Sequence, residues 1–185
     1  MAFRLTMKTK VVITALVTAM IAVGLWVVPS AVAATNLIAN PSMETAAGSV
    51  PAGWFTDVWG TNTSTFTHAT NGRTGSRSVL VTMTQRTSGD AKWLADPVAV
   101  TPGATYSYSD FYISGVTTQV YAMYIDAAGN YDVRLLANAP ASASWRQFSA
   151  TFTTPSTAAR LIVSHVLPAV GSLQLDDVSG LRLSE

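Results

Sequence analysis

The sequence "TQVYAMYID" (Thr118–Asp126) indicates a β-strand with two apolar faces. Successive side chains of a strand point to opposite sides, so this stretch divides into two alternating sets. The sets are Val120, Ala122 and Tyr124 on one side, and Tyr121, Met123 and Ile125 on the other. An outer strand of a half-solvated sheet would be polar on one side. Either both faces are covered, or one face lines a concave surface where aromatic rings meet something other than water.

Short strands of this kind recur along the chain, separated by turn residues such as Asn71-Gly72 and Thr101-Pro102-Gly103. No long stretch after residue 35 has apolar residues at helical spacing. The pattern predicts an all-β fold, an antiparallel β-sandwich or jelly roll. The expected strands are Thr63–Ala69, Ser76–Thr84, Ala91–Val100, Thr105–Ser114, Thr118–Asp126, Tyr131–Ala137, Trp145–Thr153, Ala159–Leu167 and Ser172–Leu183.

The first 33 residues have the pattern of a secretory signal peptide. A basic start is followed by the apolar run Val11–Val28, then a proline and the small-residue sequence Ala31-Val32-Ala33. The alternative is an uncleaved anchor, because about 18 apolar residues just span a bilayer. We expect cleavage after Ala33, secretion, and a single mature domain of residues 34–185.

Cleavage changes the charge of the protein. Removing Arg4, Lys8 and Lys10 from the 11 basic residues leaves eight against 10 acidic residues, a formal charge of −2. This charge balance argues against general electrostatic binding to nucleic acid or to an anionic membrane. The chain has no cysteine, so its stability depends on burial, backbone pairing and any bound metal. We expect the domain to be a monomer.

Six short motifs follow one another from Asn36 to Leu183. They are "NLIANPSME" (Asn36–Glu44), "VPAGW" (Val50–Trp54), "RTGSRSVLV" (Arg73–Val81), "TPGATYSYS" (Thr101–Ser109), "SWRQFSATFTTPS" (Ser144–Ser156) and "LQLDDVSGLRL" (Leu173–Leu183). Together they resemble the CenC-like carbohydrate-binding modules, the group that includes families four, nine, sixteen and twenty-two. The resemblance implies a non-catalytic jelly roll that binds a polysaccharide or oligosaccharide.

The resemblance also implies a structural calcium ion that ties the first strand to the last. By position its ligands are the side chains of Glu44 and Asp176, with main-chain oxygens from Ser42 and from the turn around Thr74 and Arg77. Calcium prefers six to eight oxygen ligands, and a clip that joins distant parts of a chain stabilises it most. Asp177 is the rival second carboxylate, because neighbouring strand residues face opposite sides. Without a metal, Glu44 caps a turn and the two aspartates end a solvated strand.

Sugar rings bind by stacking on aromatic side chains, with polar groups at their edges. Relatives use the tryptophans at positions 54 and 145 for packing, so we assign Trp54 and Trp145 to the core. Trp93 belongs to a strand that borders the binding face in such modules, whereas "DVWGTNTS" around Trp59 has the composition of a loop. The candidate ligand-binding residues are Trp93, Trp59, Tyr124, Tyr131 and Tyr121.

Nothing in the sequence indicates catalysis. There is no nucleophile elbow, no cysteine and no HExxH motif, and the carboxylates with a recognisable context are structural. His68 and His165 are isolated strand histidines, which we interpret as structural or exposed. Two other functions stay open: an adhesion or surface-assembly domain without a sugar site, and a small glycan hydrolase or its accessory domain.

Overall fold

A computed structural model describes residues 35–183, which belong to one compact unit, Ala33–Glu185. The predicted signal peptide and its cleavage point lie outside the described residues. Within 35–183 every regular element is a strand, and none of this part of the chain forms a helix suited to crossing a bilayer.

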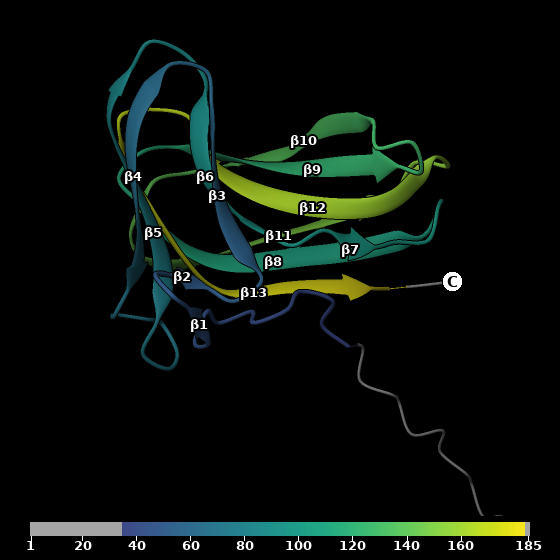
Figure 1. The fold of residues 1–185 in the computed structure, drawn as a ribbon, viewed down its shortest axis with the longest axis horizontal. Helices are drawn as coiled ribbons and strands as arrows, with labels where there is room; N and C mark the ends of the chain where they lie inside the picture. Colours follow the sequence, from purple (N-terminus) through teal and green to yellow (C-terminus); the bar gives the residue numbers. More distant parts are fainter. Residues whose placement is uncertain (1–34, 184–185) are drawn as a thin grey trace, which may run out of the picture. The chain divides into compact units, whose positions relative to one another are not determined.

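Two antiparallel sheets form the body of the fold, as Figure 1 shows, with β9, β10 and β12 of one layer above β8, β11 and β13 of the other. The six-stranded sheet has the order β10-β9-β12-β6-β3, with β7 pairing with β12, and the five-stranded sheet has the order β11-β8-β13-β5-β4. A small hairpin of β1 and β2 stands apart. The predicted antiparallel β-sandwich is thereby confirmed.

The strands are β1 Ala46–Ala47, β2 Val50–Pro51, β3 Trp54–Trp59, β4 Asn62–Ala69, β5 Ser78–Arg86, β6 Asp90–Ala95, β7 Val98–Ala99, β8 Thr105–Ser114, β9 Thr118–Asp126, β10 Tyr131–Ala139, β11 Ser142–Thr153, β12 Ala158–Leu167 and β13 Gly171–Arg182.

The main core fills the space between the two sheets. Strand β8 shows why: every second residue from Tyr106 to Ser114 is buried, so one face of the strand points inward throughout. From the opposite sheet, Val120 and Trp93 reach the same core. Complete burial of side chains of this size contributes about 1.5–3 kcal/mol each.

Besides the short hairpin of β1 and β2, which was not predicted, two strand assignments in the main sheets differ from the sequence prediction by more than their limits. The expected strand Ala91–Val100 is broken into β6 and β7, because Pro97 lacks the N–H that a continuous ladder needs. Strand β3 was not predicted at all. It lies at the edge of its sheet and most of its side chains are exposed, so it has no apolar periodicity to detect.

The two ends of the described chain lie side by side. The backbone N–H of Leu37 donates to the carbonyl of Gly180 over 2.8 Å, and the Val178 N–H donates to the Pro41 carbonyl over 2.9 Å. Asn36 reinforces this contact through its side-chain amide, which donates to the Val178 carbonyl and accepts from the Gly180 N–H. The segment 36–41 therefore runs along β13, as Figure 1 shows.

Candidate functional site

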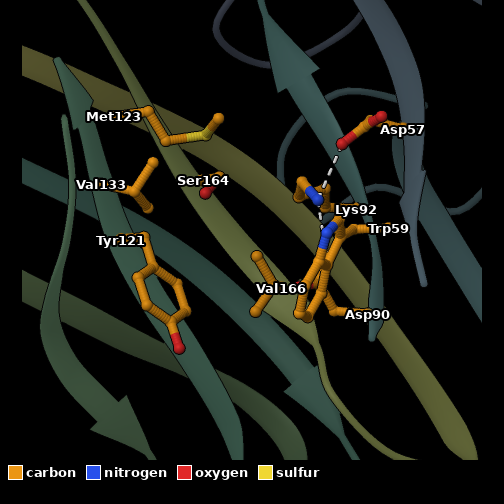
Figure 2. A pocket seen from close by; sticks show the side chains of 9 residues that line it. All are labelled: Asp57, Trp59, Asp90, Lys92, Tyr121, Met123, Val133, Ser164 and Val166. Atoms are coloured by element: carbon orange, nitrogen blue, oxygen red, sulfur yellow. Dashed lines mark hydrogen bonds and ion pairs between the residues drawn. The ribbon is translucent and has the colours of Figure 1, made fainter. Parts of the chain in front are cut away.

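The outer face of the six-stranded sheet is hollowed into a cleft of about 440 Å³. Its walls come from β3 and β6 on one side and from β9 and β10 on the other, with β12 between them, as Figure 2 shows. The lining side chains are Asp57, Trp59, Asp90, Lys92, Tyr121, Met123, Val133, Ser164 and Val166. Of the two arrangements that the apolar faces of β9 allow, the structure has the concave one: Tyr121 and Met123 face the cleft, and Val120 and Ala122 face the core.

Trp59 is the most exposed aromatic ring of the cleft, with 67% of its surface accessible. Its backbone is in close contact with the turn around Gly89. A Cβ atom on Gly89 would lie 1.7 Å from the Trp59 carbonyl oxygen, so only glycine allows this approach. Asn62 also donates to that carbonyl, over 3.2 Å. Trp59 therefore ends a strand and is held rigidly, whereas its sequence context predicted a loop.

Lys92 lies on the cleft side of β6 between two aspartates. Its Nζ is 2.7 Å from Asp57 Oδ2, on the neighbouring strand, and 2.6 Å from Asp90 Oδ1, two residues earlier on its own strand. The lysine side chain is 7% exposed, against 44% for Asp57 and 19% for Asp90. We call these three residues the ion-pair cluster.

The ion-pair cluster keeps its lysine charged. Burial by itself favours the neutral amine, but the hydrogen bonds and charges of Asp90 and Asp57 outweigh it and raise the pKa of Lys92 above its usual value. A buried charge is tolerated only when it is paired in this way. At neutral pH the cleft therefore holds one ammonium and two carboxylates, with a formal net charge of −1.

Ser164 adds an unpaired hydroxyl to the floor of the cleft. Its side chain lies on β12 between the two walls, and the residue is 1% exposed. Among residues 35–183, Ser164 Oγ and Asp110 Oδ1 are the only buried side-chain nitrogen or oxygen atoms without a hydrogen-bond partner. Only Ser164 of these two lines the cleft. Most buried polar atoms are satisfied, so an orphan in a cleft calls for an explanation.

The predicted aromatic residues fall into two groups. Trp59 and Tyr121 line the cleft, and Tyr131, 61% exposed, lies on the neighbouring strand β10 and pairs with Ile125 of β9. Trp93 and Tyr124 are buried, with 2% and 3% of their surface exposed. Neither ring lines the cleft, so the structure does not bring these two predicted residues to the candidate site.

Strand alternation explains the position of Trp93. Its neighbours on β6, Lys92 and Leu94, face outward, so Trp93 faces the core. There its ring nitrogen donates to the Leu80 carbonyl over 3.0 Å, and its ring meets Phe66 edge to face. Tyr124 likewise points inward, against Phe152. Trp54 is buried, as predicted. Trp145 is only partly buried, and the buried aromatic residue of β11 is Phe148.

Beneath the cleft, four buried polar residues from β8, β9 and β12 form a continuous chain of hydrogen bonds. His165 joins Asp110 Oδ2 through Nδ1 at 2.8 Å and Thr118 Oγ1 through Nε2 at 2.6 Å. The Tyr108 hydroxyl donates to the same Asp110 oxygen over 2.8 Å. We call these residues the interior network. Its order of hydroxyl, histidine and carboxylate is that of a hydrolase triad, but Thr118 is fully buried and no substrate can reach it.

Glu44 and Asp176, the predicted calcium ligands, both bind the turn of residues 73–77. The exposed carboxylate of Glu44 accepts from the Ser76 and Arg77 N–H groups over 2.9 and 2.8 Å. These bonds, that of Arg77 first, lower the pKa of Glu44. Asp176 is buried and accepts from the Arg73 and Thr74 N–H groups, and its burial raises its pKa. The two carboxylates therefore fix one turn from opposite ends of the chain.

Asp177 points to different partners. Its carboxylate binds the guanidinium of Arg73 at 2.6 Å and the hydroxyl of Thr74. Arg73 also stacks on Phe111 at 3.4 Å from the ring centroid. A metal ion beside Asp177 would be repelled by the positive charge of Arg73. Of the two aspartates, Asp176 is therefore the better candidate for the second metal carboxylate.

Two carbonyl oxygens of this turn approach the same point. A Cβ atom on Gly72 would lie 2.3 Å from the Arg77 carbonyl oxygen and 2.6 Å from that of Thr74, so two carbonyls converge there. The carboxylates of Glu44 and Asp176 contact the same turn, so the candidate donors here are oxygen atoms, the ligands that calcium prefers. Within 35–183, no three His, Cys, Asp or Glu side chains gather around a common metal position. Any ion here would depend on main-chain oxygens.

The sequence prediction missed the polar part of the cleft: Asp57, Asp90, Lys92 and Ser164. A lysine inside the apolar stretch "AKWLA" (Ala91–Ala95) was the one available signal. Its partner Asp57 is brought opposite by the β3–β6 register, and β3 was not predicted.

No protein-family profile and no curated protein sequence matches this chain. Solved structures do match. The enzymatically active domain of tailspike protein 4 from bacteriophage CBA120 is 19% identical with a TM-score of 0.63, over 80% of this chain and 21% of that one. The xylan-binding domain CBM22-1 of Paenibacillus barcinonensis Xyn10C is 13% identical with a TM-score of 0.59, over 82% and 97%. TmCBM61, solved with β-1,4-galactotriose, is 16% identical with a TM-score of 0.51, over 80% and 99%.

These matches concern the fold. This chain spans about a fifth of the tailspike chain but nearly the whole of the two carbohydrate-binding modules. The resemblance suggested by the six motifs is thus confirmed in the architecture: the protein has the fold of carbohydrate-binding modules of the family 4 and 22 type.

Proposed function

We propose that the mature chain is a non-catalytic module that binds a polysaccharide or oligosaccharide in the cleft of the six-stranded sheet. The observation that carries the proposal is the lining of this cleft. Trp59 and Tyr121 stand on opposite walls of an apolar floor, as Figure 2 shows, with charged and hydroxyl groups beside them. Aromatic rings at the sides and a few polar groups at fixed positions are what a sugar ring requires.

The fold supports the same assignment, because two of the similar structures are themselves modules described as binding xylan or solved with galactotriose. Tyr131 extends the aromatic surface along β10, next to the exposed Val133 and Leu135. A chain of several sugar units would therefore find apolar surface beyond the cleft itself.

The cleft does not favour hydrolysis. Glycosidases need two carboxyl groups, one of which gives a proton to the glycosidic oxygen. Asp57 and Asp90 are both hydrogen-bonded to Lys92, so neither is placed to act as that acid. We expect no release of reducing sugar on prolonged incubation.

Affinity electrophoresis and pull-down on insoluble glycans test this function. Trp59→Ala should weaken retention about thirtyfold, because a hot-spot aromatic residue contributes about 2 kcal/mol. The melting temperature of this variant should stay unchanged. Trp145→Ala is the matched control, since this partly buried tryptophan belongs to the other sheet. Equal retention of Trp59→Ala and the wild type, or no retention of any glycan, would refute the proposal and favour an adhesion or assembly role.

We also propose that calcium binds at the turn of residues 73–77 and stabilises the fold. Glu44 and Asp176 would hold the ion with the carbonyls of Ser42, Thr74 and Arg77. A ligand at 100 times its dissociation constant stabilises the native state by about 2.7 kcal/mol. Thermal unfolding with calcium and with chelator should therefore differ for the wild type and differ less for Glu44→Gln. Asp132→Asn, an exposed aspartate on β10, is the control. Identical melting in calcium and chelator would refute the site.

The remaining features of the proposed function concern where the protein acts. We propose that residues 1–33 are removed on export and that the secreted domain works as a monomer without binding nucleic acid or membrane. Mass spectrometry of the protein from culture medium should find Ala34 at its N-terminus, and size-exclusion chromatography should give the mass of one chain. An intact N-terminus in the membrane fraction would contradict this proposal.

A further inference from the structure

The polar groups of the cleft gather at one end of it, and each keeps unused hydrogen-bonding capacity. The ammonium of Lys92 has three N–H donors, and the aspartates of the ion-pair cluster take two of them. Each aspartate gives one carboxylate oxygen to Lys92. Within residues 35–183, its other carboxylate oxygen accepts no hydrogen bond. The Ser164 hydroxyl has no partner at all in this part of the chain. A ligand placed here would meet both donors and acceptors.

Spare donors and acceptors side by side match a hydroxyl group. A sugar hydroxyl both donates and accepts, so it can accept from Lys92 and donate to a carboxylate or to Ser164. Val166 of β12 is the backbone partner of Lys92, and Ser164 lies two residues further on the same face. Such diagonal neighbours lie about 7–8 Å apart, so one ligand unit between them can contact both.

The charge of the ion-pair cluster is negative, and the neighbouring cation Arg86, whose Nε donates to the Gly89 carbonyl, is not among the residues that line the cleft. The ion-pair cluster has one ammonium and two carboxylates, so a uronate or a sulfate group beside it would face an uncompensated carboxylate in a partly desolvated place. Juxtaposed like charges oppose binding strongly, and more so away from bulk water.

The nearest cation on the same face of β12 lies at the other end. Arg160 is four residues before Ser164, and alternation places both on the cleft side. Four residues of strand span about 13 Å. This exceeds the Debye length of about 8 Å at physiological ionic strength, so Arg160 does not offset the ion-pair cluster.

On the premise of the proposed function, we propose that the ion-pair cluster and Ser164 form a subsite for the hydroxyl groups of an uncharged sugar unit. The subsite rejects units that carry a carboxylate or a sulfate. The module therefore selects neutral glycan chains over acidic chains of the same backbone.

Two pairs of soluble probes test this selectivity: hydroxyethylcellulose against carboxymethylcellulose, and arabinoxylan against glucuronoxylan. Within each pair the backbone is the same and the charge differs. In affinity electrophoresis, the neutral member of at least one pair should be retained at least about tenfold more tightly than its acidic partner, as expected for like-charge rejection. Equal binding, or tighter binding of the acidic member, would overturn the inference while leaving the proposed function intact. Retention of none of the four, together with no retention on the insoluble glycans, would overturn both.

Two variants connect the selectivity to the named residues. Asp57→Asn removes the more exposed carboxylate and leaves Lys92 its partner Asp90, so it should fold and should narrow the difference between neutral and acidic probes at least threefold. Asp132→Asn is the matched control, because that aspartate also pairs with a cation but lies on the alternate side of β10 from Val133. A difference that is unchanged by Asp57→Asn would refute the role of the cluster.

Ser164→Ala separates binding from structure. The hydroxyl has no partner within the described chain, so its removal should not lower the melting temperature. We expect the affinity for the retained neutral probe to fall about three- to tenfold, the loss of one hydrogen bond. Unchanged affinity would show that the hydroxyl does not contact the sugar.

Discussion

The two faces of β12 carry polar residues that are neighbours in sequence but differ in how fully they are paired. On the inner face, His165 uses both ring nitrogens within the interior network, which joins the two sheets through Asp110 of β8. On the outer face, Ser164 has no partner among the described residues, and the ion-pair cluster next to it retains free donors and acceptors. The same strand therefore contributes to structure on one side and to a binding cleft on the other.

The difference shows how to separate structural from functional polar groups in this fold. Burial is similar for the central residue of each group, since Lys92 and His165 are both at most 5% exposed. Access distinguishes them: the ion-pair cluster opens into a cleft, whereas the interior network is closed by both sheets. Asp110 Oδ1 also lacks a partner, but it is buried where no ligand reaches.

The sharpest way to test this contrast is with the two tryptophans on either side of the sheet. Trp93→Ala should lower the free energy of unfolding by about 3–5 kcal/mol, because it leaves a cavity in the core. Trp59→Ala should change it by no more than about 0.5 kcal/mol. Urea denaturation measures both. Comparable losses would mean that Trp59 is as structural as Trp93.

A smaller loss of stability is expected within the interior network. Asp110→Asn replaces a carboxylate that accepts from His165 and Tyr108 and should cost about 1–3 kcal/mol. Retention of glycan by the folded protein should not change. Denaturant titration against Asp132→Asn, which should stay within about 0.5 kcal/mol, checks the first part. Weaker glycan retention at equal folded fraction would contradict the separation of the two faces.

Alkaline pH should lower the free energy of unfolding through one group on each face of the sheet, Tyr108 and Lys92. Burial, and then the charge and hydrogen bond of Asp110, raise the pKa of Tyr108 well above its usual range, and the aspartates raise that of Lys92. A folded-state pKa above the unfolded value gives stability that is complete below about pH 10 and is lost as the pH rises through the folded value. Unfolding free energies between pH 9 and 12 should fall, and fall less steeply for Tyr108→Phe. An identical slope would show that Tyr108 does not titrate with unfolding.

The smallest effect on stability is expected at the turn of residues 73–77, where the bound carboxylate of Glu44 is solvent-exposed. Its lowered pKa stabilises the fold above its usual titration range, and this contribution is lost as the pH falls through the folded value. In chelator, the melting temperature of Glu44→Gln should therefore depend less on pH between 5 and 3 than that of the wild type. A steeper dependence for the variant would contradict the assigned role of the carboxylate.

Much of the fold could be predicted because it depends on local alternation. The predicted limits Thr105–Ser114 and Thr118–Asp126 agree with β8 and β9 residue for residue, since each strand has a regular inward-facing set. The chain-end prediction rested instead on the family resemblance, which paired the isolated Glu44 with Asp176. Both were found on the same turn.

The cleft was harder to predict, because the residues that form it belong to five strands distant in sequence. Trp93 and Tyr124 were chosen for their ring type, and their inward direction follows from which face of each strand meets the second sheet. Lys92 and Asp57 become partners only through the β3–β6 register.

The sequence by itself determined the strands, their turns and the type of fold, because apolar alternation and turn chemistry act between near neighbours in the chain. Only the tertiary structure decided which aromatic rings are buried and which charges meet. Those outcomes depend on sheet register and on the side from which the second sheet packs, and no short stretch of residues specifies either.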